Sequence, residues 1–385
     1  MGAFWGRYMT RREFLRVAAL LGLQVWALTS FIGCLLRRSS TLPVSSVKGT
    51  EEARYYSQLR NGNVRCELCF RKCIISEGKR GFCLARENRQ GKLHTLTYGN
   101  PVAVHIDPVE KEPMFHMRPG SDTLCLGTAS CNFRCKFCIN WHIAWKAPEE
   151  VEAVPMTPAE VVQTAIEHEV PTICFTYNDP IQQYEFMFDI ARLAKEKGLR
   201  ATLHSNGSIS PEPLKAVLPY MDSVAIDLKG FDPEVYRRLT EGELDPVLNT
   251  LKTIKEEDVW LEVVCLLVPG WNDDMNDIRR MCTWLKQNLG EETVVHFSRF
   301  FPTCQLAKLP PTPLATLEQA HDIAREVGLH YVYVGNVSGH AYTNTYCPKC
   351  GKIIIERKGL LIQQNNIMDG KCQFCGHEIP GIWGE

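Results

Sequence analysis

Three cysteines within one short stretch constrain this chain more than any other feature of its sequence. Cys131, Cys135 and Cys138 are separated by three and two residues in the run Cys-Asn-Phe-Arg-Cys-Lys-Phe-Cys. Disulfide pairing among three thiols would always leave one unpaired. A loop this short can instead supply three ligands to a single metal cluster. Thiolates select zinc, copper(I) or iron–sulfur centres. A closed zinc site or a complete ferredoxin cluster needs a fourth ligand, and only His142 and Cys125 are close in sequence. A [4Fe-4S] cluster with three protein ligands would keep one iron open.

The spacing of these cysteines, with the aromatic Phe137 just before the last of them, is similar to the signature of radical S-adenosylmethionine (radical SAM) enzymes. This resemblance implies that the open iron chelates the amino and carboxylate groups of S-adenosylmethionine and that Phe137 lies against the adenine. The alternatives are a zinc knuckle or chance clustering in a cysteine-rich chain.

Length, charge and cysteine content narrow the protein class. The chain has 385 residues, which leaves room for more than one domain and for a sizeable core. Lysine plus arginine total 43 against 44 aspartate plus glutamate, so the net charge of -1 gives no electrostatic reason to expect nucleic acid. Eleven of the 17 cysteines fall into three compact groups, which indicates metal binding rather than a disulfide framework. We expect Cys174, Cys265 and Cys282 to be core residues.

The amino terminus contains an export-like leader. Residues 10–16 read Thr-Arg-Arg-Glu-Phe-Leu-Arg and precede an apolar run over residues 17–36. This pattern resembles a twin-arginine signal, and as a helix the run would be roughly 30 Å long, enough to span a bilayer. We expect residues 1–38 to be a signal or membrane anchor and 39–52 a linker. The protein is then membrane-associated and exported by the twin-arginine route; the alternative is a body anchored on the cytoplasmic face.

Residues 53–119 form a predicted cysteine-rich module. Its four cysteines suit one zinc ion or an auxiliary iron–sulfur cluster, with a reduced cluster or two disulfides as alternatives; they are Cys66, Cys69, Cys73 and Cys83. Residues 92–98 and 102–106 flank Gly99-Asn100 and predict a hairpin.

Residues 120–340 alternate short apolar strands with amphipathic helices, which predicts a parallel sheet covered by helices. We expect strands near 123–128, 172–176, 200–204, 223–228, 260–268, 293–298 and 331–335. Thr157-Pro158-Ala159-Glu160 predicts a capped helix start. The fold class is therefore α/β, an open partial (β/α)6-type radical SAM barrel between the cysteine-rich module and a carboxyl-terminal ribbon. In such barrels the chemistry lies on loops at the carboxyl ends of the strands, and the three-cysteine loop follows the first strand.

Polar residues at the other strand ends resemble cofactor-contacting positions of this family. Tyr177-Asn178-Asp179-Pro180 resembles its Gly-Gly-Glu-type motif, without the glycines. The resemblance implies cofactor contacts from Asp179, Ser205, Asn206, Asp227 and Lys229, and substrate contacts from His296 and Arg299. The alternatives are a helix cap at Asp179, an ordinary turn at Asn206, a local ion pair between Asp227 and Lys229, and a satisfied core histidine at His296.

Residues 341–385 predict a four-cysteine zinc ribbon. The ligands are Cys347, Cys350, Cys372 and Cys375, in two Cys-x2-Cys pairs separated by 21 residues. Residues 353–357 and 360–364 supply the two strands of its hairpin. Zinc binding would itself fold such a segment. Because the chain lacks a basic surface, we interpret the ribbon as a structural cap or docking element.

The combination of these parts resembles the radical enzyme of the AmmeMemoRadiSam system, a relative of the activating enzymes of pyruvate formate-lyase. The motif His-Phe-Ser-Arg-Phe-Phe-Pro at residues 296–302 supports this, whereas Thr303-Cys304 after it departs from the commoner pattern. The resemblance implies reductive cleavage of S-adenosylmethionine to a 5'-deoxyadenosyl radical, which takes a hydrogen atom from a peptide or protein. The implied partners are a low-potential electron donor and Memo-like and AMMECR-like proteins. Alternatives are a glycyl-radical-enzyme activase and a non-catalytic, membrane-tethered metal or electron-transfer scaffold.

Overall fold

The computed structural model describes residues 50–384. The predicted leader at 1–38 and most of the linker at 39–52 lie outside these residues. Within the described part of the chain, no helix is both long enough and apolar enough to cross a membrane.

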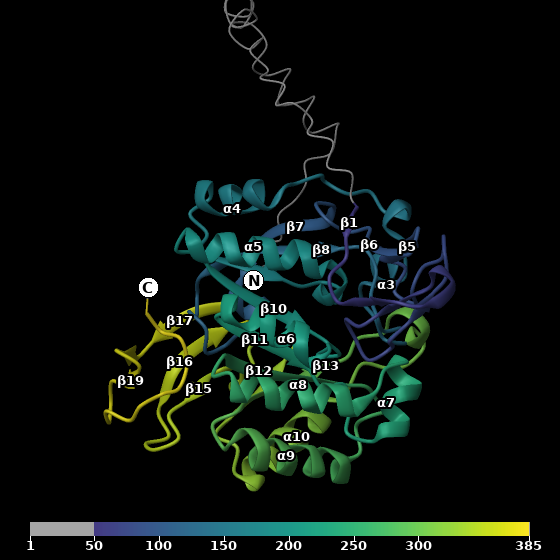
Figure 1. Ribbon diagram of the computed structural model, residues 1–385. Helices are drawn as coiled ribbons and strands as arrows, with labels where there is room; N and C mark the ends of the chain where they lie inside the picture. The colour runs from purple at the N-terminus through teal and green to yellow at the C-terminus, as the bar shows by residue number, and fades with distance from the viewer. Residues whose placement is uncertain (1–49, 385) are drawn as a thin grey trace, which may run out of the picture. The chain divides into compact units, whose positions relative to one another are not determined.

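An eight-stranded mixed sheet forms the centre of the fold (Figure 1). Seven neighbouring strands run parallel in chain order. They are β8 (Asp122–Thr128), β9 (Thr172–Phe175), β10 (Arg200–Ser205), β11 (Ser223–Asp227), β12 (Trp260–Leu267), β13 (Val294–Arg299) and β14 (Tyr331–Gly335). All seven predicted strands are confirmed. The strand order is linear, with β14 at one edge and β7 (Pro101–Pro108) antiparallel to β8 at the other, so the sheet is open.

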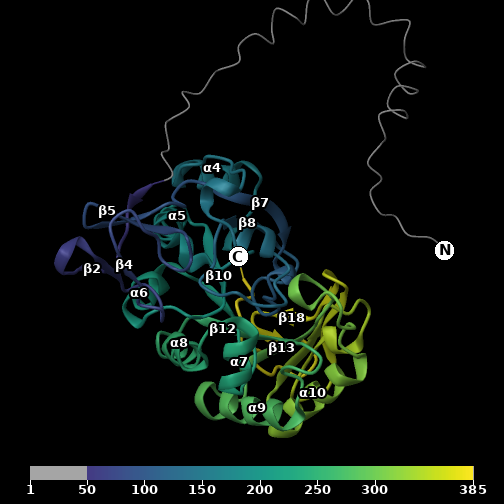
Figure 2. The same cartoon turned by 90° about the vertical axis from the view of Figure 1, so that its right-hand side faces the viewer.

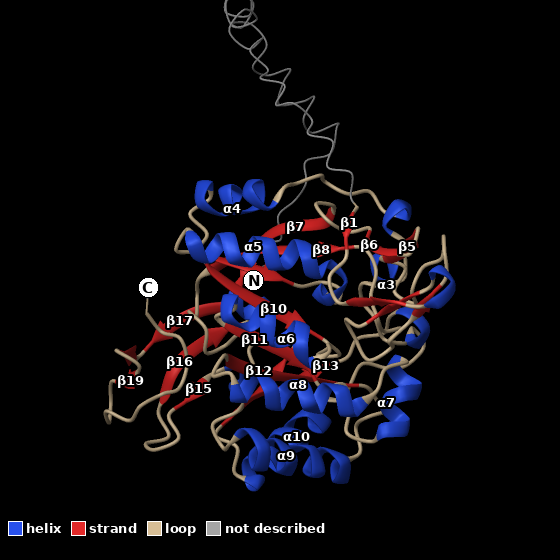
Figure 3. Cartoon of the chain, viewed as in Figure 1, coloured by secondary structure: helices blue, strands red, loops and turns tan. Residues whose placement is uncertain are grey.

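Helices cover the convex face of this sheet and bury its apolar side chains (Figure 3). They are α4 (Pro158–Glu167), α5 (Tyr184–Glu196), α6 (Pro211–Val217), α7 (Pro233–Thr240), α8 (Leu244–Glu256), α9 (Met275–Leu289) and α10 (Leu314–Val327). The predicted start of α4 is confirmed: the Thr157 hydroxyl accepts from the Glu160 N–H at 3.2 Å, and the Glu160 carboxylate accepts from the Thr157 N–H at 2.7 Å. This reciprocal pair satisfies two free donors of the first turn.

The concave face is filled by the segment that connects β7 and β8, residues 109–121. The backbone N–H groups of Phe115 and His116 donate to the buried Glu262 carboxylate of β12, at 2.9 and 2.8 Å. Val109 and Met117 pack with Ala225 and Val264 on the same face. The interior near the amino ends of the strands is therefore packed.

The cysteine-rich module consists of two small antiparallel sheets. One contains β1 (Glu51–Glu52), β6 (Lys92–Thr95) and β5 (Arg86–Arg89); the other contains β2 (Tyr56–Gln58), β3 (Val64–Cys66) and β4 (Ile74–Ile75). The predicted hairpin of residues 92–98 with 102–106 is wrong. Gln90 and Gly91, both with positive φ, form the two-residue turn that pairs β6 with β5 instead, and β7 belongs to the large sheet.

The carboxyl-terminal ribbon contains β15 (Thr345–Tyr346), β16 (Ile353–Lys358), β17 (Leu361–Asn365), β18 (Ile367–Met368) and β19 (Lys371–Cys372). The predicted hairpin of β16 and β17 is confirmed. The ribbon packs on residues at the amino ends of β13 and β14, and the buried Arg357 of β16 donates to the Phe115 carbonyl at 2.9 Å. It therefore caps the end of the barrel opposite the three-cysteine loop, as Figures 1 and 2 show.

Candidate active site

The three-cysteine loop, residues 129–140, follows the carboxyl end of β8 and is fixed by the helix that follows β11. The backbone N–H groups of Arg134 and Lys136 donate to the carbonyls of Thr240 and Leu239 at the end of α7, at 2.9 Å each. These bonds satisfy carbonyls that a helix end leaves without intrahelical partners. The loop that follows β8 is thus attached to the helix that follows β11, at the carboxyl ends of the parallel strands.

Phe133 anchors the loop in the core. Its ring is 1% exposed and packs edge-on against Phe70 of the amino-terminal module and Tyr236 of α7. Gly242 lies beside the ring so closely that a Cβ there would meet the Phe133 Cζ at 2.3 Å. Phe133 therefore requires glycine at position 242, which the sequence alone did not reveal.

Of the three cysteines of the loop, Cys135 is buried and Cys131 and Cys138 are half-buried. Burial, with a smaller contribution from neighbouring thiolates, raises the pKa of Cys131, Cys135 and Cys138 to about 12 in each case. Lys229 acts in the opposite direction and lowers the pKa of Cys135. Cys304, in the loop after β13, also raises the pKa of Cys138. Free thiols in this setting would stay protonated, and a cationic metal centre is what makes three thiolates on one loop compatible.

The donor set fits an iron–sulfur cluster. Three cysteines stand on one loop, a lysine ammonium lies near Cys135, and the loop backbone donates the Phe133 N–H to the Cys131 sulfur at 3.4 Å. Hydrogen bonds to sulfur and nearby charge are the means by which proteins tune such clusters. Cys125, one of the two sequence-near candidates for a fourth ligand, is bound elsewhere, to Glu112.

Asp179, Ser205 and Asn206 lie together and bond to one another. The Asp179 carboxylate accepts from the Ile181 N–H at 3.0 Å, the Asn206 N–H at 2.8 Å and the Ser205 hydroxyl at 3.2 Å. Asp179 is thus the cap of a short 3-10 helix at Pro180–Gln183, the alternative noted from the sequence. It is 3% exposed, and burial raises its pKa to about 6.

Asn206 connects this group to the cysteine loop. Its side-chain amide donates to the side-chain oxygen Oδ1 of Asn132 at 2.7 Å, and the Asn132 side-chain amide donates to the backbone carbonyl of Ser208 at 3.2 Å. Asn132 stands between two residues of the cysteine motif, and no sequence pattern distinguished it as a structural link. The strand-end residues therefore position the loop as well as lining the site.

Asp227 and Lys229 form an ion pair of 2.8 Å at the end of β11. The Lys229 ammonium lies 5.6 Å from the centre of the Phe137 ring, next to the cysteine loop. Lys229 and the protonated His204 hold the pKa of Asp227 well below its usual range against the effect of burial. These side chains place an anion, a cation and an aromatic ring around one edge of the site.

The two predicted substrate residues have different settings. His296 is 1% exposed and contacts the Glu262 carboxylate at 2.7 Å, with its ring stacked on Tyr333. It is therefore a satisfied core histidine rather than a residue that faces substrate. Arg299 is half-buried; its Nε donates to the Thr312 carbonyl at 2.8 Å, and within residues 50–384 its terminal nitrogens have no hydrogen-bonding partner.

The four cysteine sulfurs of the ribbon lie within 4.8 Å of one another. In the ribbon, Cys347 and Cys375 sulfurs lie 3.6 Å apart and those of Cys350 and Cys372 lie 3.8 Å apart, spacings that a single tetrahedral ion requires. In the amino-terminal module, burial raises the pKa of Cys69 to about 12, and the other three thiols of the group contribute.

The amino-terminal module contacts the cysteine loop directly. Arg71 donates through Nε to the Asn132 carbonyl at 2.8 Å, and Arg134 of the loop donates to the Phe82 carbonyl at 3.0 Å. Both guanidinium groups lie over the Phe82 ring, at 3.4 and 4.5 Å from its centre. Because Phe82 precedes Cys83, this contact joins the two cysteine groups.

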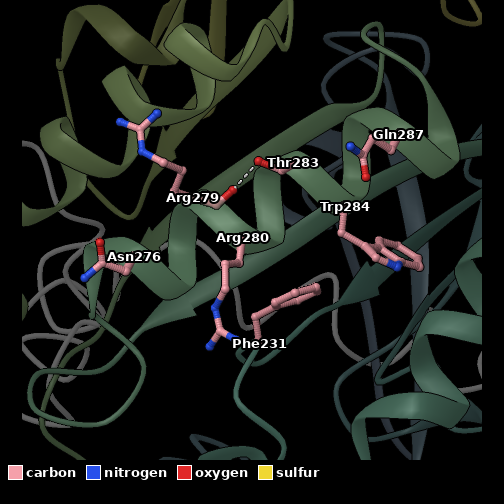
Figure 4. Close-up of a pocket in the computed structure, with 7 residues that line it drawn as sticks. All are labelled: Phe231, Asn276, Arg279, Arg280, Thr283, Trp284 and Gln287. Atoms are coloured by element: carbon pink, nitrogen blue, oxygen red, sulfur yellow. Dashed lines mark hydrogen bonds between the residues drawn. The ribbon is translucent and has the colours of Figure 1, made fainter.

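A pocket of about 530 Å³ lies on the outer surface of α9, away from these residues (Figure 4). It is lined by Phe231, Asn276, Arg279, Arg280, Thr283, Trp284 and Gln287. It contains none of the predicted site residues, so we do not assign the chemistry to it.

Comparison with known proteins agrees with this geometry. Residues 126–282 match the radical SAM superfamily. An uncharacterized protein of Methanocaldococcus jannaschii is 44% identical over 330 residues, which cover 85% of this chain and 98% of that protein. The (2S)-3-sulfopropanediol dehydratase activating enzyme of Klebsiella oxytoca is 27% identical over 29% of this chain and 35% of the enzyme. The pyruvate formate-lyase-activating enzyme of Listeria monocytogenes is 24% identical over 39% of this chain and 64% of the enzyme.

Proposed function

This chain belongs to the radical SAM superfamily and is a radical SAM enzyme, so we propose that it cleaves S-adenosylmethionine reductively and removes a hydrogen atom from a peptide or protein substrate. The observation that carries this proposal is the position of three cysteines on one loop at the carboxyl ends of the parallel strands, with Cys135 buried and the other two half-buried. The ligands of the cluster are then Cys131, Cys135 and Cys138.

The bound [4Fe-4S] cluster and S-adenosylmethionine supply the reductive cleavage and the hydrogen abstraction. The residues of this chain bind and orient them. Phe133 and the bonds from α7 hold the cysteine loop rigid, while Asp179 fixes the Asn206 turn against it. The Asp227–Lys229 pair offers complementary charges to the amino and carboxylate groups of the cofactor, and Phe137 offers a flat apolar surface.

A peptide or protein substrate is supported by the surface around the loop. Ile139 and Trp141, directly after the last cysteine, are 75% and 44% exposed, and Phe301, after β13, is 50% exposed. The backbone N–H of Gln305 donates to the Lys136 carbonyl at 3.0 Å, which brings the Phe301 loop to the cysteine loop. Exposed apolar side chains gathered at one site are typical of protein-interaction surfaces. Arg299 supplies a guanidinium for a substrate carboxylate.

For the amino-terminal module we propose an auxiliary iron–sulfur cluster at Cys66, Cys69, Cys73 and Cys83, with zinc as the alternative. Its contact with the cysteine loop through Arg71 and Arg134 supports a path for electrons from a low-potential donor. For the ribbon we propose zinc, because its sulfur spacings suit a single ion and its packing suits a structural cap.

The proposed partners rest on the resemblance of the sequence to the AmmeMemoRadiSam enzymes, and the proposed location rests on the twin-arginine-like leader, in which this chain departs from that pattern. We propose that Memo-like and AMMECR-like proteins act with this enzyme. We propose membrane association through the leader at residues 1–38, with export by the twin-arginine route, and anchoring on the cytoplasmic face as the alternative. Protease protection of the carboxyl-terminal ribbon in sealed vesicles distinguishes the two sides.

Reconstitution of the full chain tests the central activity. Iron, sulfide, dithionite and S-adenosylmethionine are supplied without oxygen, and 5'-deoxyadenosine is quantified. We expect its release from the wild type and from Cys265→Ala, a control in the core, and none from Cys135→Ala. No 5'-deoxyadenosine from fully iron-loaded wild type would overturn the proposal.

A glycyl-radical activase is the second candidate, favoured by the two activating enzymes among the relatives. A stable protein radical in a partner, detected by electron paramagnetic resonance after turnover, would identify this role. A partner whose side chain is modified but which carries no radical would exclude it.

A further inference from the structure

A fourth cluster of metal-ligating residue types lies in the barrel interior. Cys125 of β8 and Cys174 of β9 are register partners on neighbouring strands, and each is 0% exposed. Glu112, from the segment that fills the concave face, is 3% exposed and reaches the same point. The two sulfurs and a carboxylate oxygen all lie within 4.8 Å of one another. These three residues, here called the interior site, belong to none of the three cysteine groups of the sequence.

Two side-chain hydrogen bonds reach Glu112 in the interior site. The Cys125 thiol donates to Glu112 Oε1 at 3.4 Å, and the Thr176 hydroxyl donates to Oε2 at 2.5 Å. The nearest cation is the His204 ring, with its Nδ1 3.7 Å from Glu112 and its Nε2 3.4 Å from Asp227. Both distances exceed an ordinary N–H···O hydrogen bond, and His204 Nε2 is buried without a hydrogen-bonding partner in the described structure.

We propose that Cys125, Cys174 and Glu112 bind one thiolate-preferring divalent cation, with zinc as the ion that fits best, and leave its fourth position open toward His204. Two thiolates and a carboxylate are a ligand set that zinc accepts in tetrahedral geometry. Three protein ligands with an open position are characteristic of catalytic rather than structural zinc.

Binding of the cation to the interior site balances in charge and in atoms. The cation replaces the thiol protons of Cys125 and Cys174, which leave to solvent, so two positive charges enter and two depart. The net charge of the buried group is therefore unchanged. No oxidant or reductant is involved.

Side-chain contacts connect the interior site to the cysteine loop. Asp227 contacts both His204, at 3.4 Å, and Lys229, at 2.8 Å, so one short chain of side chains joins the interior site to the cysteine loop. An ion with an open position there would bind a nitrogen, oxygen or sulfur atom of a substrate that enters the barrel.

Anomalous diffraction from wild-type crystals tests the site without any substitution. The full chain is crystallised without oxygen in the presence of zinc chloride, and data are collected above and below the zinc absorption edge. We expect a peak between the two sulfurs and Glu112. A peak at Cys347, Cys350, Cys372 and Cys375 shows that zinc was available. That peak alone, with none at the interior site, would overturn the proposal.

Metal analysis in solution gives a second test with a matched control. Cys125→Ala and Cys174→Ala should each bind one equivalent of zinc less than wild type. Cys265→Ala removes a thiol that is 1% exposed on β12 and should bind as much as wild type. Unchanged zinc in both site variants would contradict the proposal. Iron at the cysteine loop is measured in the same samples, so absence of zinc from the interior site is distinguishable from absence of the cluster at the radical SAM site. If the variants do not fold, the diffraction result decides.

Discussion

Gly242→Ala perturbs the cysteine loop through a single methyl group, because the added Cβ would stand 2.3, 2.5 and 2.8 Å from three atoms of the Phe133 ring. Ordinary carbon contacts begin near 3.4 Å, so the ring must retreat by about 1 Å in a core that leaves it 1% exposed. Overpacking of this kind costs about 1–3 kcal/mol. Since Phe133 lies between the first two cysteines of the motif, we expect the cost to appear as easier opening of the loop.

The rate of iron loss to a chelator, measured without oxygen on the loaded full chain, reports this opening. A cost of about 1–3 kcal/mol corresponds to loss about 5- to 150-fold faster than in wild type. Gly384→Ala, where a Cβ meets open space, should match wild type.

A double-mutant cycle identifies the cause of the faster loss. Phe133→Leu shortens the ring that clashes, so adding it to Gly242→Ala should accelerate iron loss less than the two single effects combined. Strictly additive effects would refute the packing argument, because the two positions would then act independently.

Three further predictions concern other parts of the chain. Arg86→Met should destabilise the fold by about 3–5 kcal/mol in denaturant unfolding, because it leaves Glu185 buried without its 2.8 Å partner. Arg54→Ala removes one partner of an exposed ion pair and should cost at most about 1 kcal/mol. Equal costs of the two substitutions would contradict this prediction. Burial raises the pKa of Glu110 from 4.5 to about 7. The contribution of Glu110 to the free energy of unfolding is therefore present below pH 4.5 and is lost as the pH rises through 7, by about 3 kcal/mol in total. Glu110→Gln should flatten the dependence of the unfolding free energy on pH over that range, and an unchanged pH profile would exclude Glu110 as its cause. Cys350→Ser should remove one equivalent of zinc from the ribbon and leave the iron of the cysteine loop in place; full zinc retention would refute the ribbon site.

The parallel strands were predictable because each is buried on both faces and reads as a short apolar run. The Thr172–Phe175 strand is an example, buried at every position. The α4 start and the ribbon hairpin were predictable because their signals are local, within four residues for the helix cap and within one hairpin for the ribbon. The cysteine motif was visible for the same reason.

Contacts between distant segments were not predictable. His296 was assigned to substrate because it stands near a strand end, but its partner Glu262 is 34 residues away. Asp179 bonds to Asn206, 27 residues away. Glu112 and Cys174 meet only because the connecting segment folds back into the barrel, and Cys174 alone looked like an ordinary core residue.

The central claim is that the polypeptide supplies three ligands to the cluster and leaves one iron for S-adenosylmethionine. Electron–nuclear double resonance on the reduced, loaded enzyme, with S-adenosylmethionine labelled at its amino nitrogen and carboxylate oxygen, tests this directly. We predict hyperfine couplings from both labelled atoms to the cluster. A reduced cluster that shows neither coupling because a fourth thiolate, such as Cys304, occupies that iron would contradict the account.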